Sequence, residues 1–288
     1  MDKNLQEEMI EAIDGFKRIT KEAEEILNKV MDMGVYSITN LNGIKLVSWS
    51  DGSWEDISAM LEAHYKGDID ITEYWKTGDT KEVKLNNGDI LYLTLIGSNH
   101  DDLVKNINEA TKAAFTVQSK ILLERGKYMF NKCNSVAYSS WHESDMRIFL
   151  NTDFNNLLPK ELQSLIKTVK KETYCYALKS EFSYLYRNSV ISEEKIFLLS
   201  ETEVRGKQLL DAYEYGNGSD GKHYEYYTSN GKRVKCRLKM DDSFNYWWLR
   251  SSLVDKHGFS YFRYVNNRGA IETYRSDGII GVAPAFCI

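Results

Sequence analysis

The chain has 288 residues, 42% of them apolar and 27% charged, which suffices for one large or two small soluble globular domains. Its net charge of −5 comes without a basic stripe, which argues against nucleic acid as a partner because phosphate binding needs clustered Lys and Arg. The sequence has no uninterrupted apolar run of about 18 residues, so we expect no membrane span. The polar, acidic start at residues 1–8 predicts a protein made in the cytoplasm without a signal peptide.

Residues 1–34 are predicted to form a separate helical segment, because apolar side chains recur at heptad spacing. The two sets are Met9, Phe16, Ala23 and Val30, and Leu5, Ala12, Ile19, Ile26 and Met33. One interpretation is a coiled coil that joins copies of the chain or docks them on a larger assembly. The alternative is an amphipathic helix on its own domain, since Ile13 and Leu27 widen the apolar stripe and Gly15 weakens the helix.

From residue 35 onward the pattern changes to short strands, few helices and polar turns. Helices are predicted over residues 54–65, 102–114 and 159–171. A hairpin is predicted over residues 83–85 and 90–96, because the Asn-Gly pair between them supplies the positive φ angles of a tight turn. Further strands are predicted over residues 115–123, 196–199, 234–238, 246–249, 259–265 and 270–274. Without regular βαβ alternation, the fold class is α+β with short, mostly antiparallel strands.

Side chains that could bind a metal or react are scattered along the chain. The four cysteines form no Cys-x-x-Cys pair, which is typical of reduced, mostly buried thiols. They are Cys133, Cys175, Cys236 and Cys287. The acids that could bind calcium are Asp68, Asp70 and Glu73, and Asp241 and Asp242. Because neither group has the ligand spacing of a calcium loop, we expect no cofactor and no metal, with calcium as the alternative.

A cysteine enzyme is a second possibility. Two cationic neighbours, Lys235 and Arg237, could lower the pKa of Cys236. Alternation along the predicted strand puts Cys236 on the face of Val234 and Leu238, which favours core packing. Residues 216–223 have nearly the spacing of a phosphate-binding loop, but they end in histidine and lie among tyrosines, so they are interpreted as a hairpin loop.

The stretch from residue 241 to 288 predicts a recognition surface. It holds ten of the 36 aromatic residues, mixed with Arg, Asn and Ser. Tyr and Arg stack on sugar rings and aromatic groups, and Asn and Arg bond hydroxyls and carboxylates. The apolar blocks 246–249 and 281–288 are expected to be core strands, with the ligand-binding residues between them. These are Arg250, Ser251, Tyr261, Arg263, Asn266, Asn267, Arg268, Tyr274 and Arg275. In the alternative interpretation, alternation turns half of the stretch inward.

Several sequence blocks occur in a fixed order along residues 45–288. In the first half they are Trp54-Glu55-Asp56-Ile57-Ser58, Ala63-His64-Tyr65-Lys66-Gly67-Asp68-Ile69-Asp70-Ile71, Tyr74-Trp75 and Gly78-Asp79-Thr80. In the second half they are Ser144-Asp145-Met146-Arg147 with Leu150-Asn151, Phe197-Leu198-Leu199-Ser200-Glu201, Trp247-Trp248-Leu249-Arg250-Ser251 and Gly281-Val282-x-Pro284-Ala285-Phe286. With these blocks the chain resembles an uncharacterised bacterial and phage domain family. Its C-terminal half is similar to the C-type lectin fold of formylglycine-generating enzymes and of the variable proteins of diversity-generating retroelements. Two departures are Ser252 and Ala283, where the family usually has proline and arginine.

The resemblance implies a C-type-lectin-like domain over residues 35–288, with a family-specific half, 35–190, and a lectin-like half with the ligand loops, 191–288. It implies a non-enzymatic recognition protein of a phage or phage-tail-like particle, released by lysis, that binds a host cell-surface glycan or protein. Residues 1–34 would contact other tail or baseplate proteins and make a homo-oligomer; a trimer would multiply weak affinities. Two alternatives stay open: a formylglycine-generating-enzyme-like cysteine oxidase that uses Cys236 or Cys287, and a retroelement-diversified bacterial ligand-binding protein.

Overall fold

The computed structural model of the chain describes residues 38–39, 43–123, 128–134, 140–179, 184–206, 220–228, 230–235, 246–254 and 259–288. The chain divides into two compact units, residues 1–47 and 48–288. In the first unit, strands β1 (Ile38–Thr39) and β2 (Lys45–Leu46) pair antiparallel. The predicted heptad segment, residues 1–34, lies outside the described residues.

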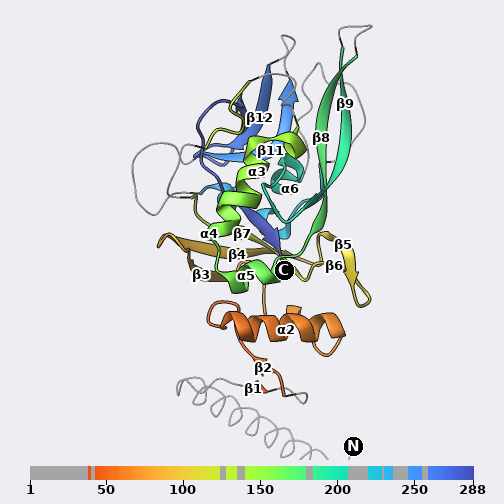
Figure 1. Ribbon diagram of the computed structural model, residues 1–288, viewed down its shortest axis with the longest axis vertical. Helices are drawn as coiled ribbons and strands as arrows, with labels where there is room; N and C mark the ends of the chain where they lie inside the picture. The colour runs from red at the N-terminus through yellow and green to blue at the C-terminus, as the bar shows by residue number, and fades with distance from the viewer. Residues whose placement is uncertain are drawn as a thin grey trace, which may run out of the picture. The chain divides into compact units, whose positions relative to one another are not determined.

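The second unit is a mixed α/β structure with antiparallel sheets and few helices (Figure 1). A five-stranded sheet has the order β10-β14-β7-β4-β3. Its strands are β3 (Thr80–Lys84), β4 (Ile90–Ser98), β7 (Phe115–Ser119), β10 (Ile196–Phe197) and β14 (Ala285–Cys287). The β3–β4 pair confirms the predicted hairpin, and Gly88 in its turn has a φ of 86°. The closing block is core, as predicted, because β14 lies between β7 and β10 and is fully buried.

Helix α2 (Trp54–Lys66) confirms the helix predicted over residues 54–65. The Ser53 side chain caps its first turn by accepting from Asp56 N, and Gly67 ends it with a φ of 82°. Near the end of the helix, the Tyr65 hydroxyl donates to Ile288 O at 3.1 Å and accepts from Ala114 N at 2.9 Å. These two bonds fix α2 to the last residue of the chain and to the start of β7.

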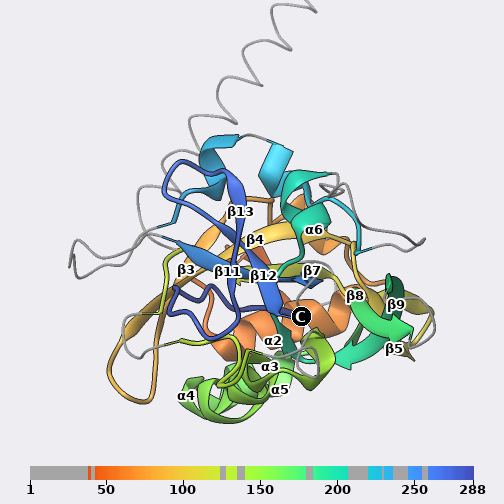
Figure 2. The same ribbon diagram turned by 90° about the horizontal axis from the view of Figure 1, so that it is seen from above.

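Short helices follow one another on one side of the five-stranded sheet (Figures 1 and 2). They are η3 (Trp141–Glu143), α3 (Asp145–Phe149), the π-helix η4 (Leu150–Phe154), α4 (Asn155–Leu157) and α5 (Lys160–Leu165). Elsewhere in the described chain lie η1 (Ile71–Glu73), α6 (Glu201–Arg205), η5 (Glu225–Thr228) and η6 (Asn230–Arg233). The helix predicted over residues 159–171 therefore stops at Leu165. Its second half is wrong because Lys167 bridges to Cys287 and a strand begins at Val169.

A four-stranded sheet has the order β6-β5-β8-β9 and was not predicted. Its strands are β5 (Asp102–Ile107), β6 (Ala110–Lys112), β8 (Val169–Lys179) and β9 (Tyr184–Glu194). The helix predicted over residues 102–114 is wrong, because Asn108 adopts a φ of 51° and turns the chain back as a hairpin. Leu103 then pairs with Val169, which joins this hairpin to the long β8–β9 ribbon.

The predicted strands near the C-terminus form a three-stranded sheet of order β11-β12-β13. They are β11 (Trp247–Val254), β12 (Ser260–Val265) and β13 (Ile271–Arg275). The register of β11 against β12 shifts between Trp248 and Ser252, so Arg250 and Ser251 lie at this irregularity. Of the strand predicted over residues 234–238, the first two residues are not in a strand and the others lie outside the described residues.

Candidate functional site

The nine predicted ligand-binding residues divide into an interior group and a more exposed group. The interior group is Arg250, Ser251, Arg263 and Asn266, and the more exposed group is Tyr261, Asn267, Arg268, Tyr274 and Arg275. Arg250 is 0% exposed and Ser251 is 2% exposed. Both side chains therefore lie in the interior of the second unit rather than on its surface.

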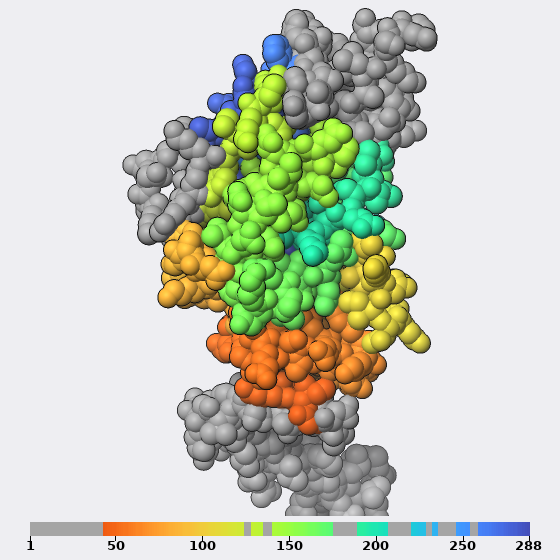
Figure 3. All heavy atoms as spheres, viewed as in Figure 1, coloured from red at the N-terminus to blue at the C-terminus, as the bar shows by residue number. Residues whose placement is uncertain are grey.

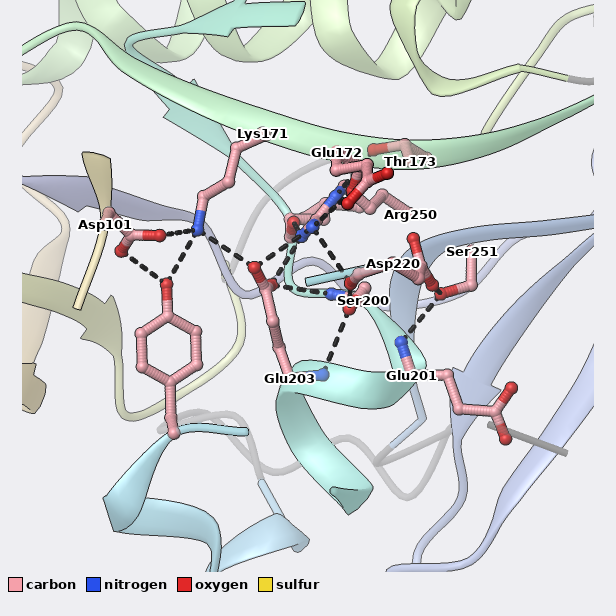
Figure 4. Close-up of polar contacts among 12 residues, drawn as sticks. Asp101, Lys171, Glu172, Thr173, Ser200, Glu201, Glu203, Asp220, Arg250 and Ser251 are labelled. Atoms are coloured by element: carbon pink, nitrogen blue, oxygen red, sulfur yellow. Dashed lines mark hydrogen bonds and ion pairs between the residues drawn. The ribbon is translucent and has the colours of Figure 1, made fainter. Parts of the chain in front are cut away.

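Arg250 lies in the interior because Glu203 of α6 neutralises it there (Figure 4). Its terminal nitrogens donate to the two Glu203 oxygens at 2.5 and 3.0 Å, and its Nε donates to Thr173 Oγ1 at 2.9 Å. Glu203 is itself fixed by a capping box, in which its carboxylate accepts from Ser200 N at 2.9 Å. Burial lowers the pKa of Arg250, but Glu203 outweighs this effect and the net pKa is raised. The guanidinium therefore stays charged.

Lys171 of β8 extends this ion pair into a buried charge network (Figure 4). Its Nζ donates to Asp101, to Glu203 at 2.9 Å and to the Tyr224 hydroxyl at 2.7 Å. The Tyr224 hydroxyl donates in turn to Asp101 at 2.7 Å. Burial disfavours both charged forms, yet the attraction of Lys171 lowers the pKa of Asp101 well below its usual value, and Asp101 with Glu203 raises the pKa of Lys171. Two cations and two carboxylates thus balance in the interior.

Asp220 adds one more buried carboxyl group to this network. One of its oxygens accepts from the Ser251 hydroxyl, and the other has no hydrogen-bond partner among the residues that the structure describes. Burial raises the pKa of Asp220 to about 7, and Arg250 and Ser251 only partly offset this. A neutral Asp220 preserves the charge balance. The network joins β8, α6, β11 and the segment from Asp220 to Tyr224, so its geometry suits holding these elements together.

Arg263 and Asn266 also face inward. Arg263 Nε lies 3.3 Å from a carboxylate oxygen of Glu201, and Arg263 is 6% exposed. The Asn266 side chain shapes the β12–β13 turn, because its oxygen accepts from Arg268 N at 2.9 Å and from Ala270 N at 3.0 Å. Both side chains therefore contact groups of the protein itself and are largely withdrawn from the surface.

The exposed residues divide further, because neighbouring positions of a strand point to opposite faces. Tyr261 of β12 pairs directly with Arg275 of β13, and the Arg275 guanidinium lies 5.9 Å from the centre of the Phe259 ring. Phe259 is 44% exposed, the Arg275 side chain is 56% exposed, and Asp277 binds that side chain at 2.8 Å. We call Phe259, Tyr261 and Arg275 the Arg275 group. Phe259 was predicted only as a strand residue, because the sequence does not show which aromatic of a strand stays exposed.

Tyr274 belongs to a different, apolar surface. It pairs with Phe262, and its ring centre lies 6.4 Å from that of Trp248 and 6.1 Å from that of Tyr264. Met129 and Ile279 form a β-bridge and are, like Tyr274, exposed large apolar residues. Asn267 and Arg268 are exposed at the β12–β13 turn, the end of the hairpin away from Arg275. The structure thus brings Tyr261 and Arg275 together but separates Tyr274 and the turn from them.

The residues considered for redox or metal chemistry lie apart from these surfaces. Cys287 is fully buried, and burial together with Asp101 raises the pKa of its thiol well above the usual value. Cys236, Asp241 and Asp242 lie outside the described residues, and Asp70 caps η1 by accepting from Thr72 N. In the described part of the chain, no three His, Cys, Asp or Glu residues are grouped so that they could hold a metal ion. None of its helices is both long and apolar enough to cross a membrane.

A comparison of the sequence with known protein families finds a match to one of them. Residues 114–288, more than half of the chain, match the model of DUF6273, described as a domain of unknown function. The chain belongs to the DUF6273 family. No curated protein and no solved structure matches it.

The DUF6273 match begins just before β7 and continues to the last residue. It includes all nine predicted ligand residues and every member of the buried charge network except Asp101, which lies before the match, between β4 and β5. Both departures from the resemblance lie in the interior: Ser252 of β11 is 4% exposed and Ala283, just before β14, is 0% exposed. An arginine in place of Ala283 would have to find its partner in the interior.

Proposed function

We propose that this chain is a non-enzymatic recognition protein whose ligand surface is the Arg275 group on the β12–β13 hairpin. The observation that carries the proposal is the exposed pairing of an arginine with aromatic rings, Arg275 over Phe259 and opposite Tyr261. Rings of this kind stack on sugars, and a guanidinium bonds hydroxyls and carboxylates. Aromatic and arginine side chains also dominate the binding energy of recognition surfaces.

Two buried ion pairs in the sheet that carries the hairpin support this role. Arg263, between the ends of β12, is anchored to Glu201, and β11 is anchored through Arg250. A ligand that meets a preformed group loses less conformational entropy on binding than one that must order a loop. The Arg275 group is small, and a stable protein interface covers roughly 800 Å² per partner, so a glycan suits it better than a protein.

The proposed setting is a phage or phage-tail-like particle, with a C-type-lectin-like fold for residues 35–288. This setting depends on the family resemblance of the sequence blocks. Residues 1–34 would dock on tail or baseplate proteins and form a homo-oligomer, and sedimentation of the full chain tests this: a monomer contradicts the coiled coil. Tail or baseplate genes beside the gene would support the particle, and a near-identical adenine-biased template there would favour the retroelement alternative.

The ligand surface is tested by binding of the full chain to an array of bacterial surface glycans and to intact host cells. The double variant Tyr261→Ala/Arg275→Ala is expected to bind at least about tenfold more weakly. The matched control is Tyr74→Ala/Lys84→Ala, which removes an exposed aromatic residue and an exposed cation elsewhere in the second unit. Unchanged binding by the first variant, with an unfolding midpoint near that of the wild type, would refute this surface.

The cysteine-oxidase alternative has a direct test. Alkylation of the native protein is expected to leave Cys287 unmodified, because its sulfur is buried and lies 3.4 Å from an Asp101 oxygen. Rapid native alkylation of Cys236 or Cys287, at a rate above that of exposed Cys133, would favour the enzyme over the recognition protein.

A further inference from the structure

A pocket of about 450 Å³ lies between α2, the β5–β6 turn and the end of α5, all within the second unit. Figure 3 shows the face on which these three segments meet, in orange, yellow and green. Apolar side chains line part of the pocket: Leu61, Tyr65, Ile107 and Leu165. Its volume falls within the range of about 300–1,000 Å³ that small-molecule sites occupy. It lies far along the chain from the β12–β13 hairpin and shares no residue with the Arg275 group.

Lys167 presents a partly buried ammonium group to this pocket. Its backbone is fixed, because Lys167 N donates to Cys287 O at 2.8 Å. Its Nζ lies 5.6 Å from the centre of the Tyr65 ring, and that ring is held by its hydroxyl bonds to Ile288 and Ala114. Burial lowers the pKa of Lys167, and Glu62 only partly offsets this. The ammonium group is therefore held in place and partly removed from water.

The other buried lysines of the described chain show what Lys167 lacks. Lys81 Nζ donates to Gly52 O at 2.6 Å, Lys171 Nζ donates to two carboxylates, and Lys235 Nζ donates to Ser119 O at 2.8 Å. Lys167 Nζ makes no hydrogen bond or ion pair with the residues that the structure describes. The acceptors of this half-buried ammonium group must come from water or from a ligand, and a carboxylate pairs with a partly desolvated cation more strongly than water does.

We propose that this pocket binds a small organic monoanion, whose carboxylate pairs with Lys167 Nζ and whose apolar part packs on Leu61, Ile107 and Leu165. A single negative charge fits better than a phosphate dianion, because the Glu62 carboxylate also lines the pocket and repels each added negative charge. The Tyr65 ring supplies a flat apolar wall beside the ammonium group. This ligand site is independent of the proposed recognition surface.

Isothermal titration of the full chain with hexanoate, hexanol and inorganic phosphate tests the site. Hexanoate is expected to bind. Hexanol, which lacks the charge, and inorganic phosphate, which lacks the apolar part, are each expected to bind at least about tenfold more weakly. Lys167→Gln is expected to weaken hexanoate binding by about tenfold or more, whereas Lys66→Gln, at an exposed lysine lining the same pocket, changes it less than about twofold. Equal binding of phosphate and hexanoate, or equal effects of the two substitutions, would overturn the proposal.

A measurement on the wild-type protein keeps the proposal testable if Lys167→Gln does not fold. Acylation of lysines by an acetyl ester, followed peptide by peptide with mass spectrometry, reports the accessibility of each amine. Saturating hexanoate is expected to slow the acylation of Lys167 and to leave that of Lys66 unchanged. No protection of Lys167 at hexanoate concentrations up to about 10 mM, equivalent to a binding free energy weaker than about 3 kcal/mol, would overturn the site.

Discussion

Replacing Lys171 with methionine tests whether the buried charge network stabilises the second unit. Lys171 is 2% exposed and its Nζ donates to Asp101, Glu203 and Tyr224. Methionine fills a similar volume but removes the charge and all three bonds. Of the two carboxylates, only Glu203 would then keep an ion pair with a buried cation, Arg250. Asp101 would remain buried without a lysine partner.

The expected loss of stability comes from the buried Asp101 carboxylate, which the substitution leaves without its lysine. Removing one partner of a buried ion pair costs about 3–5 kcal/mol, because the other charge stays in the interior without compensation. For a unit of this size, each 1 kcal/mol corresponds to about 2–4 °C in melting temperature. We therefore expect Lys171→Met to lower the melting temperature by about 6–20 °C. The double variant Lys171→Met/Asp101→Asn is expected to recover about 1–3 kcal/mol relative to the sum of the single effects, because no unpaired carboxylate remains.

Urea unfolding followed by tryptophan fluorescence measures these free energies. The matched control is Lys66→Met, which removes an exposed lysine 3.8 Å from Glu62 and is expected to change stability by less than about 1 kcal/mol. A loss below about 1 kcal/mol for Lys171→Met would refute the reasoning, since an exposed lysine would then be worth as much as the buried one. Additive effects of Lys171→Met and Asp101→Asn would refute the ion pair itself.

Two further predictions concern Asp220 and the glycines that precede β14. Because burial raises the pKa of Asp220 from 3.8 to about 7, its protonated form contributes stability that is complete below about pH 4 and lost as the pH rises through about 7. Asp220→Asn stays neutral, so its free energy of unfolding in urea, relative to that of the wild type, should rise by about 3 kcal/mol from pH 5 to pH 8. An equal difference between variant and wild type at the two pH values would contradict a buried neutral carboxyl group. Gly281→Ala is expected to lose about 1–3 kcal/mol, because a Cβ there lies 2.6 Å from Leu122 Cδ1 and from Tyr246 O. Gly278→Ala, whose nearest obstacle is the exposed Tyr274 ring, is expected to lose less than about 1 kcal/mol, and equal losses would contradict the packing argument.

The elements that sequence patterns predict correctly are those specified by neighbouring residues. Ser53 and Gly67 bound α2 by local capping, and the Asn-Gly pair specifies the β3–β4 turn. The strands β11, β12 and β13 also follow from dense β-branched and aromatic residues between polar turns. In each case the information lies within a few residues of the element, so no distant contact is needed to predict it.

The elements that sequence patterns miss depend on contacts between distant residues. Strand β8 is charged at its start, but Val169, Lys171 and Thr173 alternate as buried residues because Asp101 and Glu203 neutralise the lysine. In isolation Lys171 is indistinguishable from a solvated lysine. Val169 and Thr173 lie two residues before and two residues after Lys171, on the same face of a strand. This alternation was the one local sign of a strand with an inward-facing lysine. The division of the predicted ligand residues has the same cause, since burial of Arg250 depends on Glu203, which precedes it by more than forty residues.

The supply of acids near the C-terminus explains why Arg250 and Arg263 pair with a helix that is distant in the sequence. Among the described residues 246–254 and 259–288, the only acids are Glu272 and Asp277, and these engage Tyr264 and Arg275 near the surface. Arg250 and Arg263 must therefore find carboxylates elsewhere, and α6 supplies both, Glu203 and Glu201. The block from Phe197 to Glu201 and the block from Trp247 to Ser251, on which the family resemblance rests, meet in the interior through hydrogen bonds: Arg250 donates to Leu198 O at 2.9 Å, and Glu201 N donates to Ser251 Oγ at 2.7 Å. Phe259, Tyr261 and Arg275 lie outside the Arg250–Glu203 and Arg263–Glu201 pairs, so under the proposed function these three residues can change with the ligand while the buried charges that hold the fold stay the same.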